Sequence, residues 1–218
     1  MSLPFQAVIF DLDGTLADSL RDLGEAMNLA LADAGRPTHP IAAYRQFVGE
    51  GVDVMVAKAA APESRPEVLK GIIDGYRRHY GVIDHAHTQP YPGVVELLNA
   101  LTAAKVPMAV LSNKRDDFTK ALVQQRLGAW PFVEVRGERE GVPRKPDPTA
   151  AFEVALALNV LPAKICFVGD TAVDMKTAVN AGMQRVGCLW GFRDRDELLG
   201  AGAQRVIESP LELLNALK

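Results

Sequence analysis

The sequence predicts an α/β fold in which a parallel sheet carries helices on both faces and a separate all-helical domain is inserted after the first strand. Two observations favour this fold. Short apolar segments rich in β-branched residues alternate with longer segments of helical periodicity. The stretch between the first two strands, residues 16–89, shows helical patterns alone, and it is far longer than the dozen or so residues that a crossover connection needs.

Six short segments are expected to form the strands. Ala7–Phe10 is apolar and uninterrupted, as is typical of a strand buried on both faces. The other five are 106–111, 132–135, 165–168, 185–190 and 205–207. Helical patterns fall between them at 93–104, 116–127, 148–159 and 171–181. Because strands and helices alternate with short connections, we expect a Rossmann-like parallel sheet.

The inserted segment divides the chain into two predicted domains. Residues 1–15 and 90–218 are expected to form the Rossmann-like core, and residues 16–89 a helical cap. Helical patterns within the cap lie at 19–34, 41–47, 53–60 and 65–80. The expected hinges are Gly14–Leu16 and the proline- and glycine-rich Gln89–Gly93.

The composition is that of an ordinary globular protein. Apolar residues make up 48%, charged residues 23%, and the formal net charge is -3 with no long run of lysine and arginine. Nucleic-acid and membrane partners therefore have no support. The first ten residues have no basic leader, and their apolar run is too short for a membrane span, so we expect a cytoplasmic protein. Cys166 and Cys188 are expected to be buried thiols rather than a disulfide.

Polar side chains follow three of the predicted strands at the point where each strand ends. In chain order they are Asp11, Asp13, Ser112, Asn113 and Asp170, with Asp174 four residues further on. Because the carboxyl ends of parallel strands meet at one edge of a sheet, where open α/β sheets bind ligands, we expect these groups to lie together. Lys145 precedes another helix and could reach the same edge.

These residue types indicate phosphoryl transfer. Carboxylates crowded together repel one another unless a cation neutralises them. All-oxygen sites with few carboxylates suit Mg²⁺, which keeps positions for water and substrate phosphate. A lysine ammonium, a serine hydroxyl and an asparagine amide are donors suited to phosphate oxygens. The set predicts a magnesium site with Lys145 holding the anion and a carboxylate as nucleophile.

Four ordered motifs resemble those of the haloacid dehalogenase-like hydrolase superfamily. They are Asp11-Leu12-Asp13-Gly14-Thr15, Ser112-Asn113, Lys145-Pro146, and Gly169-Asp170 with Asp174. The resemblance spans the whole chain in order and spacing, and the helical insertion resembles that superfamily's C1 cap. Three further segments most resemble its phosphoglycolate-phosphatase-like branch: Val48-Gly49-Glu50-Gly51, Tyr91-Pro92-Gly93 and Lys145-Pro146-Asp147-Pro148.

The resemblance implies the catalytic roles. Asp11 would be the nucleophile and a metal ligand. Asp13 would be the general acid and then the general base, with its backbone carbonyl on the metal. Lys145 would steady Asp11 and the transferring phosphoryl group. The aspartate at position 13 indicates a phosphatase or phosphomutase, because the dehalogenases and ATPases of the family lack it.

The resemblance also implies the binding groups. The phosphate-binding residues would be Ser112, Asn113 and Lys145, and the metal ligands Asp11, Asp13 and Asp170. Asp174 would either reach the metal through water or orient Lys145, and Thr15 would position Asp13. A helix-capping role for Asp174 is compatible with both.

Substrate discrimination is expected to come from the cap, because the core motifs bind only the phosphoryl group and the metal. Arg45 and Glu50 are the candidates, since the glycines beside Glu50 let the backbone approach a ligand closely. The alternative for Glu50 is an acid at a helix start, favoured by the helix dipole. A glutamate in contact with substrate would disfavour an anionic substrate tail.

The predicted function is Mg²⁺-dependent hydrolysis of small phosphate monoesters through an aspartyl-phosphate. The expected partner is a small phosphorylated metabolite, and the expected state a monomer or homodimer. Two alternatives stay open, a phosphomutase resembling β-phosphoglucomutase and an inorganic pyrophosphatase.

Overall fold

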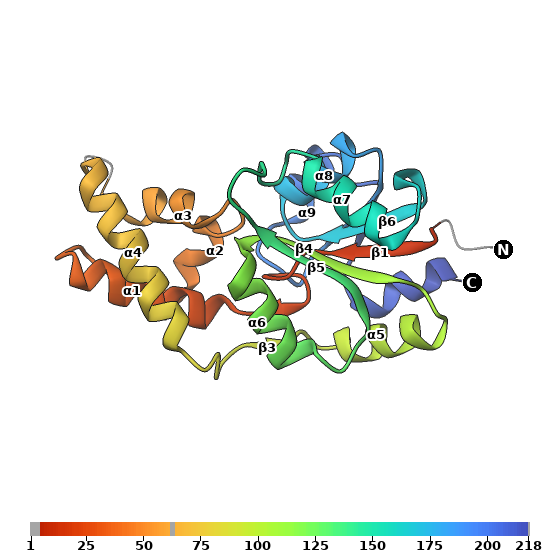
Figure 1. The fold of residues 1–218 in the computed structure, drawn as a ribbon, viewed down its shortest axis with the longest axis horizontal. Coiled ribbons are helices and arrows are strands. Elements are labelled where there is room, and N and C mark those ends of the chain that lie inside the picture. Colours follow the sequence, from red (N-terminus) through yellow and green to blue (C-terminus); the bar gives the residue numbers. More distant parts are fainter. Residues whose placement is uncertain (1–4, 62–63, 218) are drawn as a thin grey trace. The chain divides into compact units, whose positions relative to one another are not determined.

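The computed structural model describes residues 5–61 and 64–217, and the chain divides into two compact units (Figure 1). The core unit contains the residues up to Ala17 and from Pro90 onward. The inserted unit runs from Asp18 to Gln89. Two short strands, β2 (Ala17–Asp18) and β3 (Gln89–Pro90), pair where the chain leaves one unit and returns to it.

A six-stranded parallel sheet forms the centre of the core unit. In spatial order its strands are β5 (Phe132–Glu138), β4 (Met108–Arg115), β1 (Ala7–Phe10), β6 (Ile165–Gly169), β7 (Gln184–Cys188) and β8 (Arg205–Ile207). Phe10 lies beside Val110 of β4 and Val168 of β6, so these three strands end at one edge. The chain builds β4 and β5 on one side of β1 and then crosses to the other. That reversal creates the switch point at which open α/β sheets bind ligands.

Helices cover both faces of this sheet: α5 (Val94–Ala103), α6 (Asp116–Leu127), α7 (Thr149–Leu158) and α8 (Ala172–Asn180). Val8 and Phe10 of β1 belong to a hydrophobic cluster with residues of α5 and α6. Ala7 and Ile9 belong to a second cluster with residues of α7 and α8. Because successive side chains of a strand point to opposite faces, one strand serves both layers. The predicted α/β fold is confirmed.

Several element ends differ from the prediction. β4 continues beyond Leu111 through the polar residues to Arg115, because β5 also extends and Arg115 pairs with Glu138. The strand predicted at 185–190 ends at Cys188, so Trp190 lies in the loop that follows. Short helices not foreseen are η2 (Pro162–Lys164), α9 (Arg195–Gly200) and η3 (Pro210–Leu217). Cys166 and Cys188 are buried free thiols, as predicted.

Within its described residues, the inserted unit consists of helices and loops apart from the terminal residues that belong to β2 and β3. Its helices are α1 (Leu20–Asp33), η1 (Ile41–Ala43), α2 (Tyr44–Phe47), α3 (Val52–Ala59) and α4 (Pro66–Val82). α1 and α4 pack closely because Gly75 lies against Ala30, where an added Cβ would come 3.3 Å from the alanine Cβ. Across the described parts of both units, no helix has the length and apolar character to traverse a bilayer.

Candidate active site

Asp11 follows β1 directly and is almost completely buried, with 7% of its surface exposed. Its backbone N–H donates to the carbonyl of Val168 at 2.9 Å, which fixes it beside the end of β6. After Asp11 the chain forms a turn that is closed by backbone hydrogen bonds to the carbonyl of Leu12. Gly14 lies in this turn and adopts a φ of 92°. A side chain at Gly14 would also collide with the Asp170 carboxylate. Glycine is therefore required here both for its backbone conformation and for space.

Lys145 joins two of the carboxylates. Its ammonium lies 2.7 Å from Oδ1 of Asp11, 2.7 Å from Oδ1 of Asp174 and 3.0 Å from the carbonyl of Leu111, which accounts for its three donors. The other oxygen of Asp174 accepts from the backbone N–H and the hydroxyl of Thr171, at 3.0 and 2.7 Å. Asp174 therefore combines a helix cap with the orienting contact to Lys145, one of its two predicted roles.

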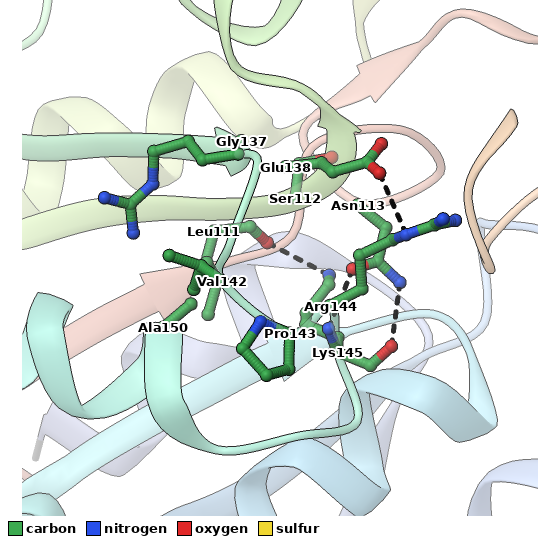
Figure 2. Close-up of a pocket in the computed structure, with 11 residues that line it drawn as sticks. Leu111, Ser112, Asn113, Gly137, Glu138, Val142, Pro143, Arg144, Lys145 and Ala150 are labelled. Atoms are coloured by element: carbon green, nitrogen blue, oxygen red, sulfur yellow. Dashed lines mark hydrogen bonds and ion pairs between the residues drawn. The ribbon is translucent and has the colours of Figure 1, made fainter.

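Asn113 holds the main chain of Lys145. Its Oδ1 accepts from the Lys145 N–H at 2.9 Å, and its Nδ2 donates to the Lys145 carbonyl at 3.1 Å. Figure 2 shows this amide facing Lys145, while the side chain of Arg144 turns to Glu138, 3.0 Å away. The residues line a pocket between the ends of β4 and β5 and the loop before α7. The side-chain amide of Asn113 thus positions the main chain of Lys145, and the role of Asn113 in binding phosphate stays a prediction.

Lys114 is a residue that the sequence motifs did not single out. Its ammonium lies 2.7 Å from Oδ1 of Asp13, and the two side chains are only 6% and 15% exposed. The backbone N–H of Lys114 also donates to the hydroxyl of Ser112 at 3.2 Å. The sequence signal that could have indicated a site role for Lys114 is its position directly after Ser112-Asn113. These polar residues belong to the same strand as the apolar segment before them. A single lysine there is indistinguishable from a solvated one.

Asp170 is fully buried at the end of β6. Its Oδ1 accepts from the hydroxyl of Thr15 at 3.0 Å, and its Oδ2 from the backbone N–H of Phe192 at 2.8 Å. This contact of Thr15 with Asp170 was not foreseen from the sequence, and the role of Thr15 in positioning Asp13 stays a prediction.

The loop after β7 secures this carboxylate. Trp190 donates its indole N–H to the carbonyl of Thr15 at 2.9 Å. A side chain at Gly191 would collide with Asp170 and with the backbone of Gly14. The sequence assigned no site role to these loop residues, because Gly191 and Phe192 carry no polar side chain that would mark one.

The carboxylates carry more negative charge than their protein partners balance. Asp11, Asp170 and Asp174 each offer an oxygen, and these oxygens lie within 4.8 Å of one another. Burial raises the pKa of Asp11 to about 7, with Asp174 adding to the rise and Lys145 opposing it. Burial, then repulsion by Asp11 and Asp174, raises the pKa of Asp170 well above its usual value. Burial lowers the pKa of Lys145, but Asp11 and Asp174 more than reverse this and keep it charged. A divalent cation would balance the excess, so the donor set fits one.

Comparisons with known proteins assign the chain to a family. A model of haloacid dehalogenase-like hydrolases matches residues 5–182. The chain belongs to the haloacid dehalogenase-like hydrolases.

Relatives of this hydrolase match over most of their length. Phosphoglycolate phosphatase of Thiobacillus denitrificans is 34% identical over 185 residues, which cover 83% of this chain and 81% of that protein. Phosphoglycolate phosphatase 1 of Pseudomonas aeruginosa is 33% identical over 217 residues, covering 95% and 78%. A crystal structure of a predicted phosphoglycolate phosphatase from Haemophilus somnus superposes with a TM-score of 0.86 at 26% identity and 99% coverage of both chains. These relatives confirm the predicted family, its phosphoglycolate-phosphatase-like branch and the enzyme class, a phosphatase.

The two cap candidates lie in the inserted unit of this haloacid dehalogenase-like hydrolase. Arg45 is part of α2, and Glu50 lies between α2 and α3. The Glu50 carboxylate is 2.7 Å from the Lys58 ammonium. Because this cation offsets its charge, Glu50 argues less strongly against an anionic substrate than the sequence suggests. A substrate-binding role for Arg45 and Glu50 stays a prediction.

Proposed function

We propose that this protein is a Mg²⁺-dependent phosphatase that hydrolyses small phosphate monoesters through an aspartyl-phosphate on Asp11. The observation that carries the proposal is the buried contact of Asp11 with Lys145, beside two further carboxylates. Such a carboxylate is held in one orientation by a cation that also attracts phosphate oxygens. The names of the relatives make 2-phosphoglycolate the first substrate to test.

The first chemical step transfers the phosphoryl group to the protein. An oxygen of Asp11 attacks phosphorus, the bond from phosphorus to the ester oxygen breaks, and Asp13 gives its proton to the departing alcohol. Lys145 compensates the charge on the phosphoryl oxygens, and Ser112 donates to one of them. In the second step Asp13 takes a proton from water, whose oxygen attacks phosphorus. This releases inorganic phosphate and regenerates the Asp11 carboxylate.

The metal ligands proposed for this reaction are the carboxylates of Asp11 and Asp170 and the backbone carbonyl of Asp13. When bound, Mg²⁺ would neutralise the carboxylates and draw charge from the phosphate oxygens. Thr15 and the Phe192 N–H hold Asp170 in place for this role. Asp174 is assigned to orienting Lys145, because its Oδ1 contacts the Lys145 ammonium directly at 2.7 Å.

The test measures phosphate release from four substrates in Mg²⁺: 2-phosphoglycolate, an aryl phosphate, a sugar bisphosphate and pyrophosphate. We expect release from the esters by the wild type and none by Asp11→Asn. Migration of phosphate on the sugar without release would instead establish the phosphomutase, and release from pyrophosphate alone the pyrophosphatase. A wild-type enzyme that carries no acid-stable covalent phosphate on Asp11 when turnover is stopped with acid would contradict the mechanism. We further propose a cytoplasmic enzyme, monomeric or homodimeric, acting on a phosphorylated metabolite.

A further inference from the structure

We propose that Lys114 binds an anionic group on the leaving alcohol, so that the enzyme selects phosphate esters whose ester carbon bears a carboxylate. This inference rests on the proposed phosphatase function and adds a specificity-determining residue within the core unit. The observation behind it is the 2.7 Å contact between the Lys114 ammonium and Oδ1 of Asp13, the proposed acid for the leaving oxygen.

The position of Lys114 is fixed by burial. Its side chain is 6% exposed and belongs to β4, whose end also carries Ser112. An ammonium taken out of water is stable only when it is paired and hydrogen-bonded, so its contact with Asp13 restrains both groups. A cation held in this way needs little reorganisation to bind a substrate anion.

Four other cations of the core unit contact carboxylates other than Asp13. Lys145 contacts Asp11 and Asp174, on the side of the nucleophile. The neighbouring arginines pair with carboxylates outside the proposed catalytic set, in the pairs Arg115 with Asp117, Arg139 with Glu153, and Arg144 with Glu138. Lys114 differs because the carboxylate it contacts is the one that serves the leaving group.

Distance selects the kind of substrate. Asp13 must come within hydrogen-bond reach of the leaving oxygen, so its partner ammonium lies on the order of 5 Å from that oxygen. A carboxylate on the ester carbon extends about 3 Å from the ester oxygen, which leaves it within hydrogen-bond reach of such an ammonium. An ammonium has three donors and can bond Asp13 and this carboxylate together. The Lys114 ammonium would also offset the repulsion between Asp13 and the substrate carboxylate as charge develops on the leaving oxygen.

The experiment compares two esters of equal carbon number, 2-phosphoglycolate and 2-hydroxyethyl phosphate, which lacks the carboxylate. The measured quantity is the ratio of their kcat/KM values. We expect the wild type to favour 2-phosphoglycolate and Lys114→Met to lower the ratio about tenfold to a hundredfold, the usual worth of a hydrogen bond to a charged group. Lys114→Arg should retain part of the preference. Lys120→Met, which removes an exposed lysine paired with Asp116 on α6, should leave the ratio unchanged.

Two outcomes would overturn the inference while leaving the phosphatase in place. One is a wild type without preference between the esters, and the other is an equal loss on both esters in Lys114→Met, which would mean that Lys114 acts through Asp13 alone. A wild type inactive on both esters and on an aryl phosphate would overturn the proposed function itself. A measurement on the wild type tests the assignment without any variant. Glycolate should inhibit aryl phosphate hydrolysis more strongly than ethylene glycol, and equal inhibition by the two would contradict the assignment.

Discussion

The Lys145 ammonium and the Asp11 carboxylate are in direct contact at 2.7 Å, although 134 positions separate them in the chain. Both side chains are buried, so their orientation is set by the protein rather than by solvent. The proposed nucleophile is thus held before any substrate arrives.

Asp11→Asn should abolish phosphate release while the protein still folds. A neutral amide cannot act as the carboxylate nucleophile, but it has nearly the same volume. Phosphate release and circular dichroism on the same purified sample check this. Turnover at the wild-type level, in a preparation cleared of contaminating phosphatase, would refute the proposed intermediate.

Lys145→Met should destabilise the protein and abolish turnover. Removing one partner of a buried ion pair costs about 3–5 kcal/mol, because Asp11 and Asp174 are left without their cation. Adding Asp174→Asn to this variant should recover part of the loss. Urea unfolding measures both, with Lys176→Met on the surface of α8 as the control. A double variant no more stable than Lys145→Met would show that Asp174 does not carry the uncompensated charge.

Chelation should remove activity, and Mg²⁺ should restore it. The carboxylates of Asp11 and Asp170 would otherwise repel the incoming phosphate. Ca²⁺ should inhibit, because its larger and looser coordination misplaces the nucleophile. Added Mg²⁺ should raise the Tm of the wild type, since it binds the folded state, but not that of Asp170→Asn. Full activity in excess EDTA would contradict the metal assignment.

The stability of the metal-free protein should respond to pH through Asp11. Its pKa is raised from 3.8 to about 7 in the folded state, by burial first. The folded form therefore binds a proton more tightly than the unfolded form, so Asp11 destabilises the fold progressively as pH rises from about 4 to about 7. In EDTA, Asp11→Asn should gain stability relative to the wild type over this window. A difference independent of pH would exclude the raised pKa.

Substitutions at Glu50 or Arg45 should change the relative rates on different metabolites more than the rate of aryl phosphate hydrolysis. Glu50→Gln removes the partner of Lys58 in the inserted unit, whereas the core motifs are untouched. Each variant is assayed on its best metabolite and on an aryl phosphate. Equal changes in both activities, or none, would place specificity outside this loop.

Strand periodicity was sufficient to predict the sheet and the edge where the polar groups gather. Asp11 and Asp170 were predicted as site residues because each comes at the end of an apolar segment. Those segments form strands in the structure, so both residues lie at strand ends as the local pattern indicates. The contact of Thr15 with Asp170 was not foreseen, since it spans 155 positions and no local pattern records it. Lys114 and the Trp190–Phe192 loop were missed for the same reason, because their importance depends on which strands become neighbours.

The strand order of the core unit has a consequence for how activity is lost. β1 lies between β4 and β6, and the groups that meet at its end come from segments as far apart in the chain as Asp11 and Asp170. A partly folded state in which β1 is not paired with both β4 and β6 therefore lacks the complete site, and the site's assembly requires pairings of long sequence separation. Enzymatic turnover is then a reporter of complete core assembly, and during denaturation it should disappear together with the sheet rather than survive it.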